Sequence, residues 1–169
     1  MSPTRSAAAP NLWACVATAV QPTPTENPMI DSFKSPLVVV GRVLLALMFI
    51  LSGIQKLTGL EGTAGYIASG GLPFPMLLAV VVGLLELLGG LAIAVGFQAR
   101  AAALALGLFT LAASVLFHKF WAAPADQAMV QQLMFLKNLS VAGGMFIVAA
   151  LGAGPASLDA RRALRPAHA

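Results

Sequence analysis

The sequence predicts an all-α integral membrane protein, a four-helix bundle with a short interfacial helix between the first and second spans. Three observations support this fold class. Four apolar segments each approach or exceed the roughly 20 residues that a spanning helix needs. Only 9% of the 169 residues are charged and 59% are hydrophobic, whereas soluble domains carry about 25% charged residues. Each apolar segment also gathers its polar and small residues on one face, as expected around a polar interior.

Residues 1–35 differ in composition from the rest and are predicted to form a disordered leader. Five prolines interrupt a stretch rich in Ser, Thr and Ala. Its apolar piece, residues 12–20, is too short to span a bilayer and, with Arg5 before it, weakly resembles a signal peptide. We favour a leader, or a start site placed upstream of a native Met29, because the strong first span can direct insertion itself.

The membrane domain is predicted over residues 36–160, followed by a basic cytoplasmic tail over 161–169. Its four spans, each an apolar run with few charges, are Leu37–Leu57, Phe74–Phe97, Arg100–Trp121 and Met129–Leu151. An even number of spans puts both ends on one side of the membrane. If that side is the cytoplasm, it collects most of the basic residues, so the positive-inside rule predicts cytoplasmic N- and C-termini.

The connections between the spans are short. Between the first and second, apolar residues near helical spacing predict an interfacial helix within 58–72, ended by Gly70. Pro73 then suits the first turn of the second spanning helix. Residues 96–100 allow only a tight hairpin, and residues 119–128 combine interfacial aromatic side chains with a proline turn.

The polar and small residues of each span recur at helical spacing, which places them on one helix face. In the second span, Gly83 and Gly90 flank Glu86 and permit close approach of another helix. Lipid cannot solvate polar groups, so we expect all four faces to point into the bundle. These faces comprise Arg42, Ala46, Phe49, Gly53 and Lys56 in the first span, Gly83, Glu86 and Gly90 in the second, Arg100, Gly107, Ser114 and His118 in the third, and Lys137, Ser140 and Gly144 in the fourth.

The charged side chains within the spans are the first candidates for function, because a charge at bilayer depth costs about 2.5–3.5 kcal/mol on insertion scales. At 1.5 Å per residue, Glu86 would lie about 18–20 Å below the outer surface, Arg42 about 22 Å and Lys137 about 12 Å. We therefore expect Arg42 to pair with Glu86 and Lys137 to remain an unbalanced cation. Lys56 and His118 would lie nearer the outer mouth of the bundle.

Two interpretations of these charges stay open. In the structural one, the Arg42–Glu86 pair fixes helix register, while Lys137 bonds a carbonyl or extends to the interface. In the functional one, the unbalanced cation marks a pocket for an electron-rich or anionic group, such as a quinone carbonyl, or a proton relay. Both interpretations require a polar bundle interior.

The sequence argues against several kinds of chemistry. A single cysteine, Cys15, excludes a disulfide relay within the chain. His118 precedes Lys119 and Trp121, as expected of an interfacial residue, and the other histidine, His168, lies in the tail, so no metal or haem site is predicted. The net charge of +4 comes from scattered basic residues, so we expect no binding of nucleic acid.

A series of short motifs follows one another between about residues 36 and 159. They are Gly41-Arg42, Phe49, Ser52-Gly53, Lys56, Gly71-Leu72-Pro73, Glu86, Gly89-Gly90, Gly96, Arg100, Phe117-His118-Lys119-Phe120-Trp121, Lys137-Asn138, Gly143-Gly144 and Ser157-Leu158-Asp159. Each motif is weak individually, but together and in this order they are specific. On these motifs the chain resembles the DoxX family of small bacterial inner-membrane proteins.

The resemblance implies a multi-pass protein of the bacterial inner membrane, acting as a subunit or accessory of a quinone-linked oxidoreductase system. No intrinsic cofactor is expected, so quinone is the implied ligand and partner subunits would supply electrons. A small transporter or proton-conducting protein, or a non-catalytic membrane scaffold, remains an alternative. The candidate ligand-binding or buried polar cluster is Arg42, Lys56, Glu86, His118, Lys137 and Asn138.

Overall fold

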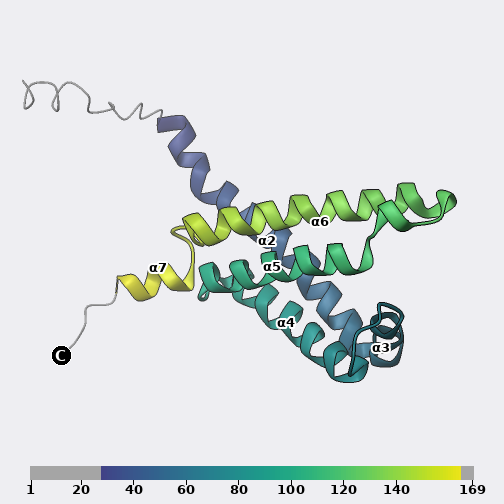
Figure 1. The fold of residues 1–169 in the computed structure, drawn as a ribbon. Helices are drawn as coiled ribbons and strands as arrows, with labels where there is room; N and C mark the ends of the chain where they lie inside the picture. The colour runs from purple at the N-terminus through teal and green to yellow at the C-terminus, as the bar shows by residue number, and fades with distance from the viewer. Residues whose placement is uncertain (1–27, 165–169) are drawn as a thin grey trace, which may run out of the picture.

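The fold is made of helices, with no strand among the described residues, 28–164, of the computed structural model. This confirms the predicted all-α class (Figure 1). The elements are, in chain order, α2 (Pro28–Thr58), α3 (Leu60–Ser69), α4 (Pro75–Val95), α5 (Ala99–Phe117), the 3-10 helix η1 (Phe120–Ala122), α6 (Ala125–Leu151) and α7 (Leu158–Ala163).

Four helical segments are long and apolar enough to cross a membrane, as predicted. They are Lys34–Thr58, Pro75–Val95, Ala99–Ala122 and Ala125–Leu151. The first helix begins at Pro28, so residues 28–35 of the predicted leader are helical. The rest of the leader, residues 1–27, and the last residues of the basic tail, 165–169, lie outside the described part of the chain.

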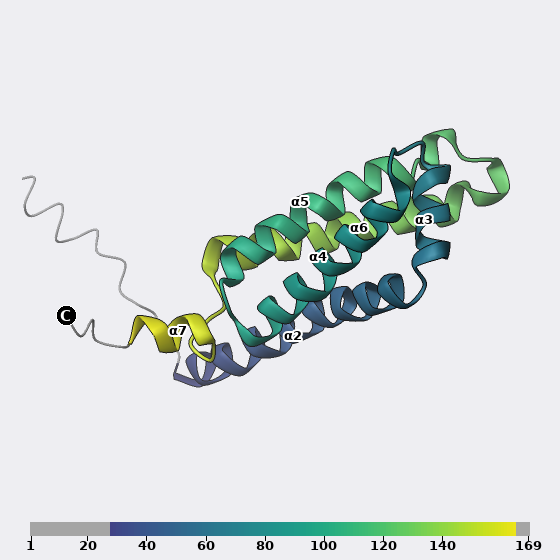
Figure 2. The same cartoon turned by 90° about the horizontal axis from the view of Figure 1, so that it is seen from below.

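The predicted helix between the first two spans is confirmed as α3, which crosses one end of the bundle (Figure 2). Gly70 caps it and donates its backbone N–H to the carbonyl of Ile67, at 3.1 Å. The start of the next helix differs from the prediction, because Pro75 rather than Pro73 occupies its first turn. Phe74 precedes it in a left-handed conformation, with φ of 52°, and so turns the chain into the helix.

The four long helices form two antiparallel pairs. Helix α2 packs mainly on α4, and α5 packs mainly on α6, while contacts between the pairs are fewer. The two pairs converge toward α7 and diverge toward α3 and η1 (Figure 1). We call these two ends the α7 end and the α3 end. A wedge between the pairs therefore widens toward the α3 end.

Glycines let α2 and α4 touch along their backbones. A Cβ at Gly53 would lie 2.5 Å from the backbone nitrogen of Leu87, and a Cβ at Gly90 would lie 3.0 Å from that of Ile50. Such close packing is what holds helices together in lipid, where apolar burial contributes little. The predicted inward face of the second span is confirmed, because Gly83, Glu86 and Gly90 are all buried.

The narrow part of the wedge is filled by apolar side chains from all four long helices. Ile93, Leu106 and Met145 are fully buried there and pack with Ala46 and Phe49 of α2. They form a closed core between the wide part of the wedge and the α7 end.

The α7 end is fastened by the segment that follows α6. The Asp159 carboxylate accepts hydrogen bonds from the backbone N–H groups of Gln98, at 2.8 Å, and Ala99, at 3.0 Å. The first N–H groups of α5, which have no partner within their own helix, are satisfied in this way. Arg42 of α2 donates to the carbonyls of Ala153, at 2.5 Å, and Ala156, at 2.9 Å. We call these contacts the C-terminal clasp.

Candidate functional site

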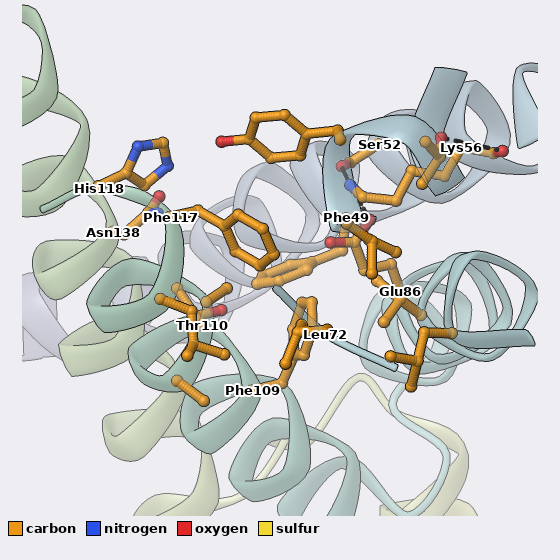
Figure 3. Close-up of a pocket in the computed structure, with 18 of the residues that line it drawn as sticks. Phe49, Ser52, Lys56, Leu72, Glu86, Phe109, Thr110, Phe117, His118 and Asn138 are labelled. Carbon is orange, nitrogen blue, oxygen red and sulfur yellow. Dashed lines mark hydrogen bonds and ion pairs between the residues drawn. The ribbon is translucent and has the colours of Figure 1, made fainter. Parts of the chain in front are cut away.

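A cavity of about 380 Å³ occupies the wide part of the wedge. All four long helices line it, and α3 contributes Thr63, Tyr66 and Ile67. Its volume falls within the range of about 300–1,000 Å³ typical of small-molecule sites. Figure 3 shows its polar residues in two groups, with Ser52, Lys56 and Glu86 on one side and His118 and Asn138 on the other. We call this cavity the wedge pocket.

Most of the pocket wall between the two polar groups is apolar and aromatic. Phe49, Phe109 and Phe117 contribute rings from α2 and α5 (Figure 3). Tyr66 of α3 stacks on Phe117, with ring centroids 4.9 Å apart and an interplanar angle of 25°. Aromatic faces of this kind favour a flat, apolar ligand.

The first polar group is an ion pair supported by a hydroxyl. Lys56 Nζ lies 2.7 Å from Glu86 Oε2 and donates to Ser52 Oγ at 2.5 Å. The Glu86 side chain is 7% exposed and that of Lys56 is 27% exposed. The carboxylate is therefore held at the pocket wall by a lysine that still reaches the cavity.

This pairing corrects one prediction. Glu86 pairs with Lys56, in the last turn of α2, and not with Arg42. The register between α2 and α4 is the reason. Gly53 meets Leu87, which places Lys56 close to Glu86, whereas Arg42 lies beside Gly96 at the α7 end. Arg42 is buried in the C-terminal clasp and does not line the wedge pocket.

The second polar group is centred on His118, at the end of α5. Its Nδ1 lies 3.0 Å from the amide oxygen of Gln131 on α6. An amide oxygen only accepts hydrogen bonds, so Nδ1 carries the proton, and in the neutral ring Nε2 remains a hydrogen-bond acceptor. The Asn138 amide, from α6, lines the same side of the pocket. Among residues 28–164 there is no cluster of His, Cys, Asp and Glu that could hold a metal ion.

Lys137 also lines the pocket, but from an exposed position on α6. Its ammonium makes no hydrogen bond or ion pair with any described residue. The prediction that Lys137, Ser140 and Gly144 form an inward face is wrong for Ser140, which is exposed and donates to the Leu136 carbonyl of its own helix. Helix α6 instead buries Ala142 and Met145, because its main partner is α5 and its contact with α2 is small.

The third span differs from its predicted face at one end. Gly107 and Ser114 are buried as predicted, whereas Arg100 is exposed at the α7 end. Its guanidinium lies 3.4 Å from the Leu151 carbonyl at the end of α6. Arg100 therefore contributes to the contact between α5 and α6 at the α7 end, far from the pocket.

The wedge pocket thus brings together five of the six residues of the predicted cluster, Lys56, Glu86, His118, Lys137 and Asn138.

Sequence reasoning missed the roles of Gln131 and Tyr66. Gln131 could have been found by pairing α5 with α6 as an antiparallel hairpin, since residues near the end of one helix meet those near the start of the next. No sequence signal places α3, and with it Tyr66, over the pocket.

Comparison with known proteins places this fold among bacterial membrane proteins. The DoxX family model matches residues 37–119. Inner membrane protein YqjF of Escherichia coli (strain K12) is 43% identical over 122 residues, which cover 72% of this chain and 88% of that protein. Inner membrane protein YphA of the same organism is 35% identical over 125 residues, covering 74% and 89%.

A more distant relative carries an activity in its name. The Bacillus subtilis (strain 168) protein named "Putative oxidoreductase CatD" is 31% identical over 101 residues, covering 60% of this chain and 73% of that protein. No solved structure has significant similarity to the chain. The family match and the two inner-membrane relatives, on a fold with four membrane-spanning helices, show that this chain is a multi-pass inner membrane protein of the DoxX family.

Proposed function

We propose that this protein is a membrane component of a quinone-linked oxidoreductase system and that it binds a quinone ring in the wedge pocket. The observation that carries the proposal is an apolar cavity of about 380 Å³ with hydrogen-bonding groups at two separated sides. A quinone ring has apolar faces and two carbonyl oxygens on opposite edges. Lys56 on one side and the Asn138 amide on the other are donors suited to those oxygens.

Electrons would come from a partner protein. The sequence has a single cysteine and shows no redox-cofactor motif, so we expect its own residues to bind and orient the quinone and a partner to transfer the electrons. The oxidoreductase name of the Bacillus subtilis relative is consistent with such a system. The proposal predicts that the protein copurifies from native membranes with an oxidoreductase subunit.

The alternative of a small transporter or proton-conducting protein has less support. A path from Glu86 to the α7 end would have to pass Ile93, Leu106 and Met145, which are fully buried in the closed core. Opening that core would require the two helix pairs to separate. The wedge pocket is better suited to binding than to passage.

Thermal unfolding of the purified, detergent-solubilised full chain tests the proposal. With a quinone probe such as decylubiquinone present at one hundred times its Kd, the free energy of unfolding should rise by about 2.7 kcal/mol, because only the folded protein binds. Ala113→Phe should abolish this stabilisation, since Ala113 lines the pocket and a phenyl group would fill it. Ala150→Phe is the matched control, because Ala150 is exposed on α6 and does not line the pocket.

The proposal fails if decylubiquinone gives no stabilisation of the wild-type protein. It also fails if Ala113→Phe, while remaining folded by circular dichroism, is stabilised as much as wild type. A loss of binding in Ala150→Phe alone would place the site elsewhere.

A further inference from the structure

The charges that line the wedge pocket do not balance. Lys56 and Glu86 neutralise each other at 2.7 Å. The contact between His118 Nδ1 and the Gln131 amide oxygen needs a proton on Nδ1 but no charge on the ring. Lys137 then adds one positive charge that no described side chain neutralises. With His118 counted as neutral, the lining residues carry a formal net charge of +1 around a cavity whose walls are mainly apolar.

The position of Lys137 makes this charge costly. It lies in the middle of α6, within a segment long and apolar enough to span the membrane. A cation at such a depth is unfavourable by about 2.5–3.5 kcal/mol on insertion scales unless water or an anion compensates it. Lys56, which also lines the pocket, has that compensation from Glu86. Lys137 has none within residues 28–164.

The side chain stands at the edge of the pocket and not in its depth. Gly144 of α6 meets Leu45 of α2, with a would-be Cβ 3.2 Å from the leucine side chain. That contact is seven residues, or about 10 Å, nearer the α7 end than Lys137. On the α3 side of it the helix pairs diverge, and Lys137 is exposed while still lining the cavity. A ligand seated in the wedge can thus reach the ammonium without entering the closed core.

We propose that the wedge pocket binds an anionic amphiphile, whose apolar body fills the aromatic cavity and whose one negatively charged oxygen pairs with Lys137. Asn138, the next residue on α6, also lines the pocket and offers an amide N–H to the same end of the ligand. The charged oxygen can belong to an acidic hydroxyl on a quinone ring or to the carboxylate of a single-chain lipid. The inference rests on the proposed pocket and adds a charge requirement that a neutral quinone does not meet.

Three probes of known charge test the inference by equilibrium binding to the full chain in neutral detergent at pH 7.5. They are 1,4-naphthoquinone, which is neutral, 2-hydroxy-1,4-naphthoquinone, which is ionised at this pH, and palmitate. The wild-type protein should bind the hydroxylated ring at least about tenfold more tightly than the neutral ring, as expected for a close charge pair in a desolvated site.

Variants then assign the preference to one residue. Lys137→Gln should abolish the tenfold preference while changing the Kd of the neutral ring by less than about twofold, because only the charged oxygen uses the ammonium. Lys137→Arg should keep the preference. Lys119→Gln is the control, because Lys119 is exposed and does not line the pocket. A cooperative thermal unfolding transition without ligand would show that each variant is folded.

The outcomes separate this inference from the proposed function. Equal affinity of the wild-type protein for both rings, or a preference that survives Lys137→Gln, overturns the inference and leaves the quinone proposal standing. Binding of palmitate alone, lost in Lys137→Gln, supports the inference and contradicts the quinone proposal. Failure of all three probes to bind overturns both.

Discussion

At the residue scale, Glu86 shows how helix register selects one partner from two. Both Arg42 and Lys56 lie on the same buried face of α2. The depth estimate favoured Arg42 because it took the ends of the apolar segments as the membrane surfaces. Helix α2 begins at Pro28, well before its apolar segment. The ends of the apolar segments therefore do not fix how far α2 is shifted along α4. The backbone contact of Gly53 with Leu87 fixes it instead and brings Lys56 to Glu86.

Replacing Glu86 should reveal the cost of an unpaired lysine. Glu86→Gln leaves Lys56 without its counter-ion and should lower the free energy of unfolding by about 1–3 kcal/mol, since an unsatisfied group that is largely shielded from water is destabilising. The double variant Lys56→Gln with Glu86→Gln should recover part of this loss, because two amides can hydrogen-bond without charge. Denaturation in mixed detergent micelles measures both.

A coupling energy near zero in this double-mutant cycle would contradict the ion pair. Arg42→Gln combined with Glu86→Gln is the control cycle. Arg42 donates to Ala153 and Ala156 in the clasp, so its loss should add independently to that of Glu86.

At the scale of helices, the sequence predicted some faces correctly because glycine and polar residues coincide on them. The second span is the clearest case, since Gly83, Glu86 and Gly90 recur at helical spacing and all three are buried. The predicted face of the fourth span was wrong because the polar residues of that span do not lie on the face that contacts the other helices. Ser140 satisfies its hydroxyl within its own helix, which removes the reason for it to face inward.

Adding one methyl group at Gly53 should separate α2 from α4. A Cβ there would lie 2.8 Å from the Gly83 carbonyl oxygen and 2.5 Å from the Leu87 nitrogen, and both are backbone atoms that cannot rotate away. Gly53→Ala should therefore lower the free energy of unfolding by about 1–3 kcal/mol, as overpacking does in other cores.

Gly41→Ala is the matched control in the same helix, because nothing lies within 4 Å of a Cβ at that position. It should leave stability unchanged or raise it by up to about 1 kcal/mol, since alanine favours the helix over glycine. Equal effects of the two substitutions would argue against the close backbone contact.

At the scale of the whole molecule, the protein is two helix pairs joined firmly at the α7 end and open at the α3 end. The four spans and the interfacial helix could be predicted from length and hydropathy, and five of the six candidate polar residues do line one cavity. The wedge itself could not be predicted. It depends on which pairs of helices approach closely, and hydrophobic segments alone carry no information on that choice.

The C-terminal clasp should contribute measurably to the stability of the α7 end of the bundle. Asp159 accepts from the first N–H groups of α5, so Asp159→Ala leaves Gln98 and Ala99 without those partners. We expect a loss of about 1–2 kcal/mol in the free energy of unfolding, the upper part of the range for helix caps. Asp126→Ala is the control, because Asp126 lies in the first turn of α6 without a hydrogen bond to any described residue. Only its helix-dipole interaction is lost there, which is worth about 0.3–1 kcal/mol. If both variants unfold at the same denaturant concentration, the hydrogen bonds of Asp159 to the start of α5 contribute no more to stability than an ordinary surface charge.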